Sequence, residues 1–229
     1  MTKILYFPVY FEAGRHPVFI FLMGVTSLLP VSSLHANPQD NWYLERDREL
    51  GFIGGTNTPQ DIIHGPDGKT FIVEISKDRV QFLDQNQQVF ALVGAGDEPR
   101  AGSFANGKLF IVSSKSDRVY VFDEDGNSLY NFGSSGTGNG QFREPFGITT
   151  SYSGTELEVF VSDQANDNIQ VFDEYGAFKR KFWSVDDKPR DIAIDDNGSV
   201  FVADFSSRVN VFDKNGTLLR TITGVQGNP

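Results

Sequence analysis

Chemically reactive side chains are scarce in this sequence. Its 229 residues include no cysteine, two methionines and three histidines. No disulfide framework, thiolate metal site or cysteine nucleophile is therefore available. Because His16 and His35 belong to the N-terminal 36 residues, His64 is the single histidine of the remaining chain. That excludes a histidine-based metal cluster there, and a Ser-His-Asp triad would depend on His64 alone.

Basic residues are also fewer than acidic ones. Twenty lysines and arginines stand against 30 aspartates and glutamates, which gives a formal net charge of −10. A field of that sign repels a nucleic-acid backbone, so no nucleic-acid partner is expected. The abundant residues are instead 23 glycines and 21 phenylalanines. Many turns between aromatic and β-branched segments predict an all-β architecture.

The first 36 residues differ from everything that follows. Lys3 and Arg15 flank a mixed start, an apolar run covers 18–31, and a stretch of small residues ends at Ala36. This order predicts a secretory signal peptide over 1–36. The run is shorter than the ~20 residues that cross a bilayer, so no stable membrane span is expected in the mature chain. We expect a secreted or periplasmic protein; an uncleaved N-terminal membrane anchor is the alternative.

A short motif recurs along the rest of the chain. Val-Phe-Asp occupies 121–123, 171–173 and 211–213, and Phe-Leu-Asp at 82–84 is an imperfect fourth copy. An apolar alternation precedes each copy, and a turn and another alternating segment follow it. In most of these turns Asp caps its own backbone and Gly takes a positive φ, which is typical of hairpins. The pattern predicts sixteen short strands in four meander sheets over 59–223, with hardly any helix.

Prolines mark the start of each unit. Pro59, Pro99, Pro145 and Pro189 are followed by units of about 59–98, 99–144, 145–188 and 189–228. The predicted organisation is therefore a signal over 1–36, a linker over 37–48 and a repeat domain over 49–229. Within that domain, residues 49–55 resemble an outer strand that lacks three strands before it.

Two stretches carry a family resemblance. Residues 132–148 are similar to the linker and first strand of an NHL repeat, and 161–173 are similar to its core. The core pattern returns over 202–213, whereas Ile75 and Ser114 stand in the first two units where Asp163 and Asp204 stand later. The resemblance implies a β-propeller of four-stranded antiparallel blades in an exported, bacterial protein.

The resemblance also suggests a wheel of six blades. Four units and one orphan strand then predict an incomplete, open wheel that is truncated at its C-terminus. Open blade edges are sites of self-association, so the chain is expected to associate with itself there.

Two faces are expected for such a domain. In a four-stranded meander, the loops between second and third strands lie with the loops between blades. The binding-face candidates gathered there, with a glycine loop over 133–140, are Lys77, Arg100, Lys115, Arg143, Arg190 and Phe205. The opposite face collects the acidic turn residues Asp84, Asp123, Glu124, Asp125, Asp173, Glu174, Asp195, Asp196 and Asp213. Binding usually resides on loops of a rigid scaffold, so the mixed face is the candidate surface.

Two aspartates raise the question of a metal. Asp61 and Asp191 each lie two residues after the opening proline, on the predicted innermost strand. Calcium takes several oxygen ligands, and the resemblance includes lactonases and lyases that hold calcium in the central channel. The other two units have Ala101 and Gly147 at this place, so the ring is half empty. No cofactor is expected; if calcium binds, Asp61 and Asp191 are the candidate ligands.

Three functions remain open on these grounds. The favoured one is a non-catalytic module that recognises a protein, peptide or glycan through its loop face. The alternatives are a calcium-dependent lyase or lactonase-like enzyme and a non-functional fragment of an interrupted gene.

Overall fold

The computed structural model describes residues 34–36, 42–44, 58–183 and 188–223. The chain divides into two compact parts, Met1–Gly51 and Phe52–Pro229. In the first part, β1 (Leu34–Ala36) pairs antiparallel with β2 (Trp42–Leu44). The greater part of the predicted signal and linker, and all of the strand predicted over 49–55, lie outside the described residues.

The second part contains four antiparallel sheets of four strands, each a meander in chain order. The first sheet is β3 (Pro59–His64), β4 (Thr70–Glu74), β5 (Arg79–Leu83) and β6 (Val89–Gly94). The second is β7 (Pro99–Ala105), β8 (Lys108–Ser113), β9 (Arg118–Asp123) and β10 (Ser128–Phe132). The third is β13 (Pro145–Ser153), β14 (Glu156–Asp163), β15 (Asn168–Asp173) and β16 (Phe178–Trp183). The fourth is β17 (Pro189–Ile194), β18 (Val200–Asp204), β19 (Val209–Phe212) and β20 (Leu218–Ile222).

The all-β fold predicted from the repeat is confirmed. Helical structure in the described residues is limited to three single 3-10 turns, η2 (Pro66–Gly68), η3 (Ile75–Lys77) and η4 (Gln164–Asn166). The loop between the second and third sheets adds a pair that the sequence did not predict. There, β11 (Ser134–Ser135) runs parallel to β12 (Gln141–Phe142).

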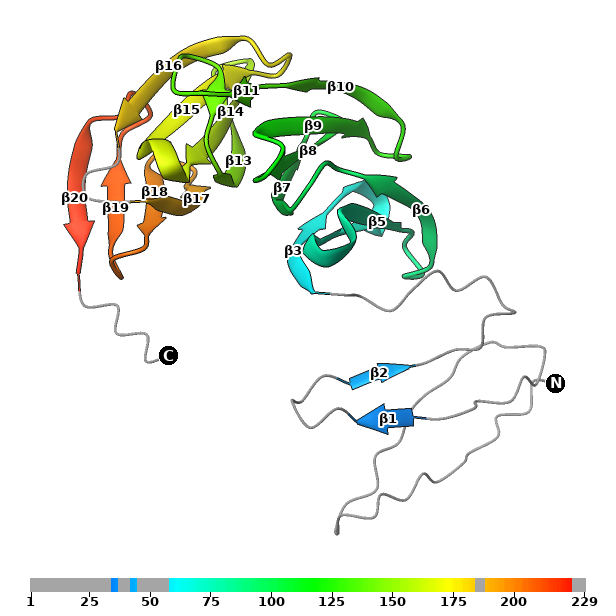
Figure 1. Cartoon of the computed structure of the whole chain (residues 1–229). Helices are drawn as coiled ribbons and strands as arrows, with labels where there is room; N and C mark the ends of the chain where they lie inside the picture. The colour runs from blue at the N-terminus through cyan, green and yellow to red at the C-terminus, as the bar shows by residue number, and fades with distance from the viewer. Residues whose placement is uncertain (1–33, 37–41, 45–57, 184–187, 224–229) are drawn as a thin grey trace, which may run out of the picture. The chain divides into compact units, whose positions relative to one another are not determined.

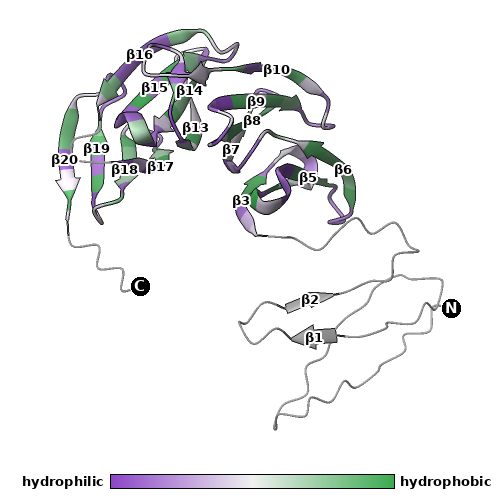
Figure 2. Cartoon of the chain, viewed as in Figure 1, coloured by the Kyte–Doolittle hydropathy of each residue, from purple (hydrophilic) through white to green (hydrophobic). Residues whose placement is uncertain are grey.

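The sheets pack face to face in chain order. The first strands of neighbouring sheets contact one another, β3 with β7, β7 with β13 and β13 with β17. Figure 1 shows the four sheets following one another around an arc, with these strands on the inner side. Hydrophobic residues gather in the strands of these sheets (Figure 2).

Three apolar clusters fill the spaces between the sheets. The first and second sheets meet at residues that include Phe71, Phe82, Leu109 and Phe122. The second and third meet at residues that include Phe110, Val121, Val159 and Phe172, and the third and fourth at Phe160, Phe182, Val200 and Phe212, among others. Each fully buried phenylalanine contributes roughly 2 kcal/mol by leaving water, so these clusters are the main source of cohesion between sheets.

The turn chemistry predicted from Asp and Gly is confirmed. In the turn after Val-Phe-Asp of the third unit, Oδ1 of Asp173 accepts the N–H of Tyr175 at 2.9 Å and that of Ala177 at 2.8 Å. Gly176 closes this turn at φ 85°. The same pair of bonds occurs at Asp84, Asp123, Asp195 and Asp213. These bonds satisfy two backbone donors per turn, which fixes the hairpin register.

The closing glycines of the later units also serve packing between sheets. A Cβ on Gly176 would lie 2.6 Å from Phe132 of the second sheet, and one on Gly216 would lie 2.3 Å from Phe182 of the third. In the first unit this place is taken by Gln87, which is exposed and adopts φ 60°. Glycine is therefore required where the turn rests on the preceding sheet.

The residues of the first two units that are equivalent to Asp163 and Asp204 differ from those predicted. Strand pairing places Glu74, Ser113, Asp163 and Asp204 opposite the four opening prolines. The partners of Asp163 and Asp204 in the first two units are thus Glu74 and Ser113, not Ile75 and Ser114. All four are buried, and each has a polar partner: Arg79 Nε donates to Glu74, and Arg208 Nε lies 3.3 Å from Asp204. Every unit therefore ends its second strand on a buried polar residue.

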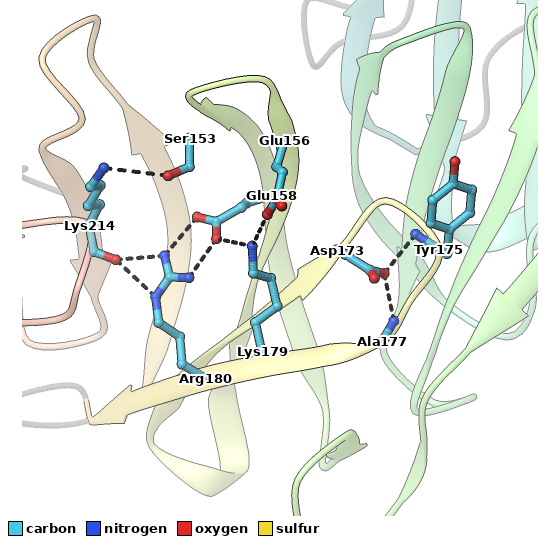
Figure 3. A network of polar contacts seen from close by, with 9 residues as sticks. All are labelled: Ser153, Glu156, Glu158, Asp173, Tyr175, Ala177, Lys179, Arg180 and Lys214. Atoms are coloured by element: carbon cyan, nitrogen blue, oxygen red, sulfur yellow. Dashed lines mark hydrogen bonds and ion pairs between the residues drawn. The ribbon is translucent and has the colours of Figure 1, made fainter.

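A charged network joins the third and fourth sheets. Both oxygens of the buried Glu158 accept from the Arg180 guanidinium, at 2.7 and 2.8 Å, and Lys179 lies 2.8 Å away. The same guanidinium donates to the main-chain oxygen of Lys214 in the fourth sheet, at 2.7 and 3.1 Å (Figure 3). The hydrogen bonds from Arg180 hold the pKa of Glu158 at about 2. Glu158 thus fixes an arginine that connects two sheets.

Candidate binding face

A row of cations and aromatic rings crosses three neighbouring sheets on the predicted loop face. Arg100, Phe146 and Arg190 each follow the opening proline of their unit. The guanidinium carbon of Arg190 lies 4.5 Å from the centre of the Phe146 ring, and that of Arg100 lies 5.1 Å from the same ring. Arg190 also lies 5.4 Å from the centre of the Phe205 ring, which is 65% exposed. The four residues, Arg100, Phe146, Arg190 and Phe205, are here named the Arg-Phe row.

The last residue of the first unit supplies a carboxylate to this row. Arg100 donates to Glu98 at 2.7 Å, and Lys115 forms an ion pair with the other oxygen of Glu98. The hydrogen bond from Lys115, with a smaller contribution from Arg100, lowers the pKa of Glu98 below its ordinary value. Lys115 is 65% exposed, so this pair is largely screened by water.

The two other predicted cations lie apart from the row. Lys77 is exposed at the end of η3. Arg143 is also exposed and lines a shallow pocket with Asp117, Ser135, Glu144 and Ala165. The structure therefore brings Arg190 against Phe205, connects Arg100 to Arg190 through the Phe146 ring, and connects Lys115 to Arg100 through Glu98. Phe146 was missed, although its place directly after Pro145 is the signal that would have identified it.

The glycine loop beside this face is held by a buried polar network. Oδ1 of Asp163 accepts the N–H of Arg143 at 2.8 Å, and its Oδ2 accepts from Asn166 at 2.7 Å and Gln170 at 3.2 Å. Asn166 and Gln170 in turn donate to the main-chain oxygens of Gly136 and Gln141, at 2.8 and 2.6 Å.

Burial raises the pKa of Asp163 to about 6, although these three hydrogen bonds oppose the rise. The loop is thus fixed to the third sheet by donors that converge on one carboxyl group.

Asp61 and Asp191, the two aspartates considered as calcium ligands, accept hydrogen bonds from backbone N–H groups. Asp61 accepts the N–H of Ile62 and, across to the second sheet, that of Gly102, each at 2.8 Å. Asp191 accepts the N–H of Ile192 at 2.9 Å. Burial raises the pKa of Asp61, and the charge of Asp191 adds a smaller increment. The described residues contain no group of three or more His, Cys, Asp or Glu placed to hold a metal ion.

The acidic turns on the other face form bridges between sheets. Lys69, just before β4, lies 3.1 Å from Asp125 in the turn of the second sheet. Lys108 in β8 pairs with Glu174 in the turn of the third sheet, which lowers the pKa of Glu174. Part of the acidic charge is therefore neutralised by the preceding sheet, which leaves the Arg-Phe row as the stronger candidate for a ligand.

Comparison with known proteins supports the repeat assignment. No family model matches the chain. It is 26% identical over 117 residues to protein brain tumor of Drosophila melanogaster, and 30% identical over 137 residues to E3 ubiquitin-protein ligase TRIM71 of Rattus norvegicus. These matches cover 50% and 56% of this chain but only 11% and 15% of the two relatives. Both relatives are NHL-repeat proteins, as the sequence resemblance implied.

Solved structures confirm the propeller-type fold. Hydrazine synthase of Kuenenia stuttgartiensis aligns with a TM-score of 0.61 at 22% identity, over 77% of this chain and 52% of that one. A streptogramin B lyase aligns with a TM-score of 0.59 at 14% identity, over 72% of this chain and 54% of its own. Virginiamycin B lyase of Staphylococcus aureus aligns with a TM-score of 0.61 at 11% identity, over 74% and 57%. At these identities the similarity concerns the fold alone.

In the part of the chain that the structure describes, no helix is a candidate membrane span. None of its helices has the length and apolar character needed to cross a bilayer.

Proposed function

We propose that this chain is an exported, non-catalytic recognition module that binds a protein or peptide on the face carrying the Arg-Phe row. The observation that supports this most directly is the row itself, in which two arginines and two phenylalanines from three rigid sheets converge. Arginine and aromatic side chains are the residues that contribute most to protein-binding surfaces. The NHL-repeat nature of the two relatives agrees with a binding role.

The enzyme alternative has less support. A calcium-dependent lyase or lactonase would draw its metal ligands from Asp61 and Asp191. Both oxygens of Asp61 already accept main-chain N–H groups, so a cation there would compete with the hydrogen bonds that hold the start of β3. The two lyase structures share this fold at 14% and 11% identity, which carries no information on chemistry.

Binding can be tested on arrays of random synthetic peptides and of glycans, with the purified full chain as the probe. We expect a defined subset of peptides to be selected. The double variant R190Q/F205A should lower these signals about tenfold or more, because two central contacts are lost.

The matched control is R220Q/Y175A, which also removes one arginine and one exposed ring, since Tyr175 is 70% exposed. It should leave the selected peptides unchanged. Equal losses in both variants, or selection of glycans without peptides, would contradict the proposed function.

Export rests on the predicted signal over 1–36 and is proposed on that basis. Mass mapping of the chain recovered from its own host should give an N-terminus at Asn37 in the secreted or periplasmic fraction. A chain that keeps Met1 or the residues next to it in the membrane fraction would contradict cleavage and favour the anchor.

A further inference from the structure

The Arg190 guanidinium lies over the rings of two phenylalanines. Its guanidinium carbon lies 4.5 Å from the centre of the Phe146 ring and 5.4 Å from that of the Phe205 ring. Its buried Nε has no hydrogen-bond partner, and no carboxylate among the described residues pairs with the guanidinium. A guanidinium that lies over ring faces leaves the in-plane N–H donors of its two terminal nitrogens for a ligand, in the fork that matches a carboxylate.

Arg100 occupies the equivalent position and has a carboxylate in place. Arg100 follows Pro99 as Arg190 follows Pro189, and Arg100 is bound by Glu98, two residues earlier. The residue at that place, two before Arg190, is Lys188. Both Glu98 and Lys188 have positive φ, 55° and 43°, so the local backbone is the same. Arg190 therefore has a second cation at the place where Arg100 has its counter-ion.

We propose that Arg190 binds a carboxylate of a peptide ligand, with an apolar or aromatic side chain of that ligand resting on Phe205. This assignment rests on the proposed function and specifies its ligand. Phe205 is 65% exposed, so its ring has surface left beside the stacked guanidinium. The ligand carboxylate pairs with Arg190 in the way that Glu98 pairs with Arg100.

The net charge favours a carboxylate in a peptide over a nucleic acid. The chain carries a formal charge of −10. A nucleic acid brings one negative charge with every nucleotide, and its approach is opposed by this field over its whole length. A single carboxylate next to an apolar side chain meets little of that repulsion and gains a charge-assisted, bidentate contact.

The probe for this site is the dipeptide N-acetyl-Phe-Glu-amide, titrated into the full ¹⁵N-labelled chain and followed at the Arg190 Nε–Hε resonance by NMR. R190Q identifies that resonance by its loss. We expect a saturable shift with the Glu peptide and binding at least about tenfold weaker for N-acetyl-Phe-Gln-amide, since a charged hydrogen bond contributes about 1.5–3 kcal/mol. Uridine monophosphate is titrated in parallel as the phosphate probe.

The decisive variant is K188E, which places a glutamate two residues before Arg190, as Glu98 lies two residues before Arg100. It should occupy Arg190 internally and weaken the Glu peptide about tenfold or more, while the fold is kept. The matched control K214E makes the same charge change at an exposed lysine outside the binding-face candidates and should leave the affinity within about twofold, because exposed charges are screened.

Each other outcome has a definite meaning. Equal weakening by K188E and K214E would reduce the effect to net charge and overturn the proposal, as would equal affinity for the Glu and Gln peptides. Tighter binding of uridine monophosphate would assign the site to phosphate. Should neither dipeptide shift Arg190 while arrays still select peptides, this inference is wrong and the proposed function stands. Absence of peptide selection on the arrays would remove both.

Discussion

Replacing Gly216 by alanine is expected to cost about 3 kcal/mol of unfolding free energy, the sum of a strained backbone and an overpacked contact. Gly216 has φ 89°, a conformation in which an L side chain is strained by about 1 kcal/mol or more. Its new Cβ would lie 2.3 Å from Cβ and Cγ of Phe182 in the third sheet. The third and fourth sheets must then separate or Phe182 must leave its place, either of which loosens their shared apolar cluster.

Gly198 provides the matched control for this variant. It closes another turn of the same unit at φ 79°, and nothing lies within 4 Å of a Cβ placed on it. G198A should therefore show the backbone strain alone, about 1 kcal/mol. The measurement is the urea midpoint of both variants and the wild type. Equal losses would show that the contact between Gly216 and Phe182 relaxes without cost and does not set the spacing of the sheets.

Glu158→Gln is expected to cost about 2 kcal/mol at neutral pH, because it leaves Arg180 without its carboxylate. Loss of a fully buried pair costs 3–5 kcal/mol, and the 26% exposure of Arg180 reduces that figure here. E156Q is the control: Glu156 also pairs with Lys179, but it is 73% exposed and should contribute less than about 0.5 kcal/mol.

The effect of Glu158 should depend on pH in a defined direction. Its pKa in the folded chain is about 2, below the ordinary 4.5, so the folded state favours the charged form. The stabilisation is therefore present above about pH 4.5 and is lost as the pH falls towards 2. Urea unfolding at a series of pH values should show the wild type and E158Q converging over this interval. A gap that stays constant down to pH 3 would show that Glu158 acts by packing rather than by charge.

Asp163 also makes the unfolding free energy depend on pH, but in the opposite direction. Burial raises its pKa to about 6, so its stabilisation is present below its ordinary 3.8 and is lost as the pH rises through 6. This contribution is common to the wild type and E158Q. It cancels in their difference, which isolates the titration of Glu158.

Local features of the fold could be predicted from the sequence because they depend on neighbours in the chain. The Asp and Gly of each turn act within five residues, and the alternation of apolar residues sets which side of a strand is buried. For that reason the four meander sheets and the turns that follow Val-Phe-Asp were predicted from the sequence. The parallel pair β11–β12 was not, since its bonds depend on how the glycine loop folds back on the third sheet.

The error at Ile75 and Ser114 has a simple cause. Asp163 pairs with Asn168, five residues later, whereas the N–H of Asp204 bonds to the carbonyl of Arg208, four residues later. Counting back from Val-Phe-Asp therefore reaches different strand positions in different units. Only the pairing of strands shows that Glu74 and Ser113 are the equivalents.

The candidate site was predicted in composition but not in arrangement. Arg100, Arg190 and Phe205 belong to the expected face. The contact of both arginines with Phe146 depends on the distance between sheets. That distance is set by the apolar clusters and by closing glycines such as Gly176 and Gly216, none of which shows in the spacing of the charged residues.

Because of Gln87, the first repeat is not interchangeable with the third or fourth. At the places of Gly176 and Gly216, any side chain would meet a phenylalanine of the preceding sheet within 2.6 Å. The first unit could therefore not be copied into the third or fourth position without also exchanging Gln87 for glycine. A designer who shuffles or duplicates these units is free to choose among the later ones, whereas the first is specialised for its own position. Gln87 thus excludes the first unit from the third and fourth positions but sets no order among the later units.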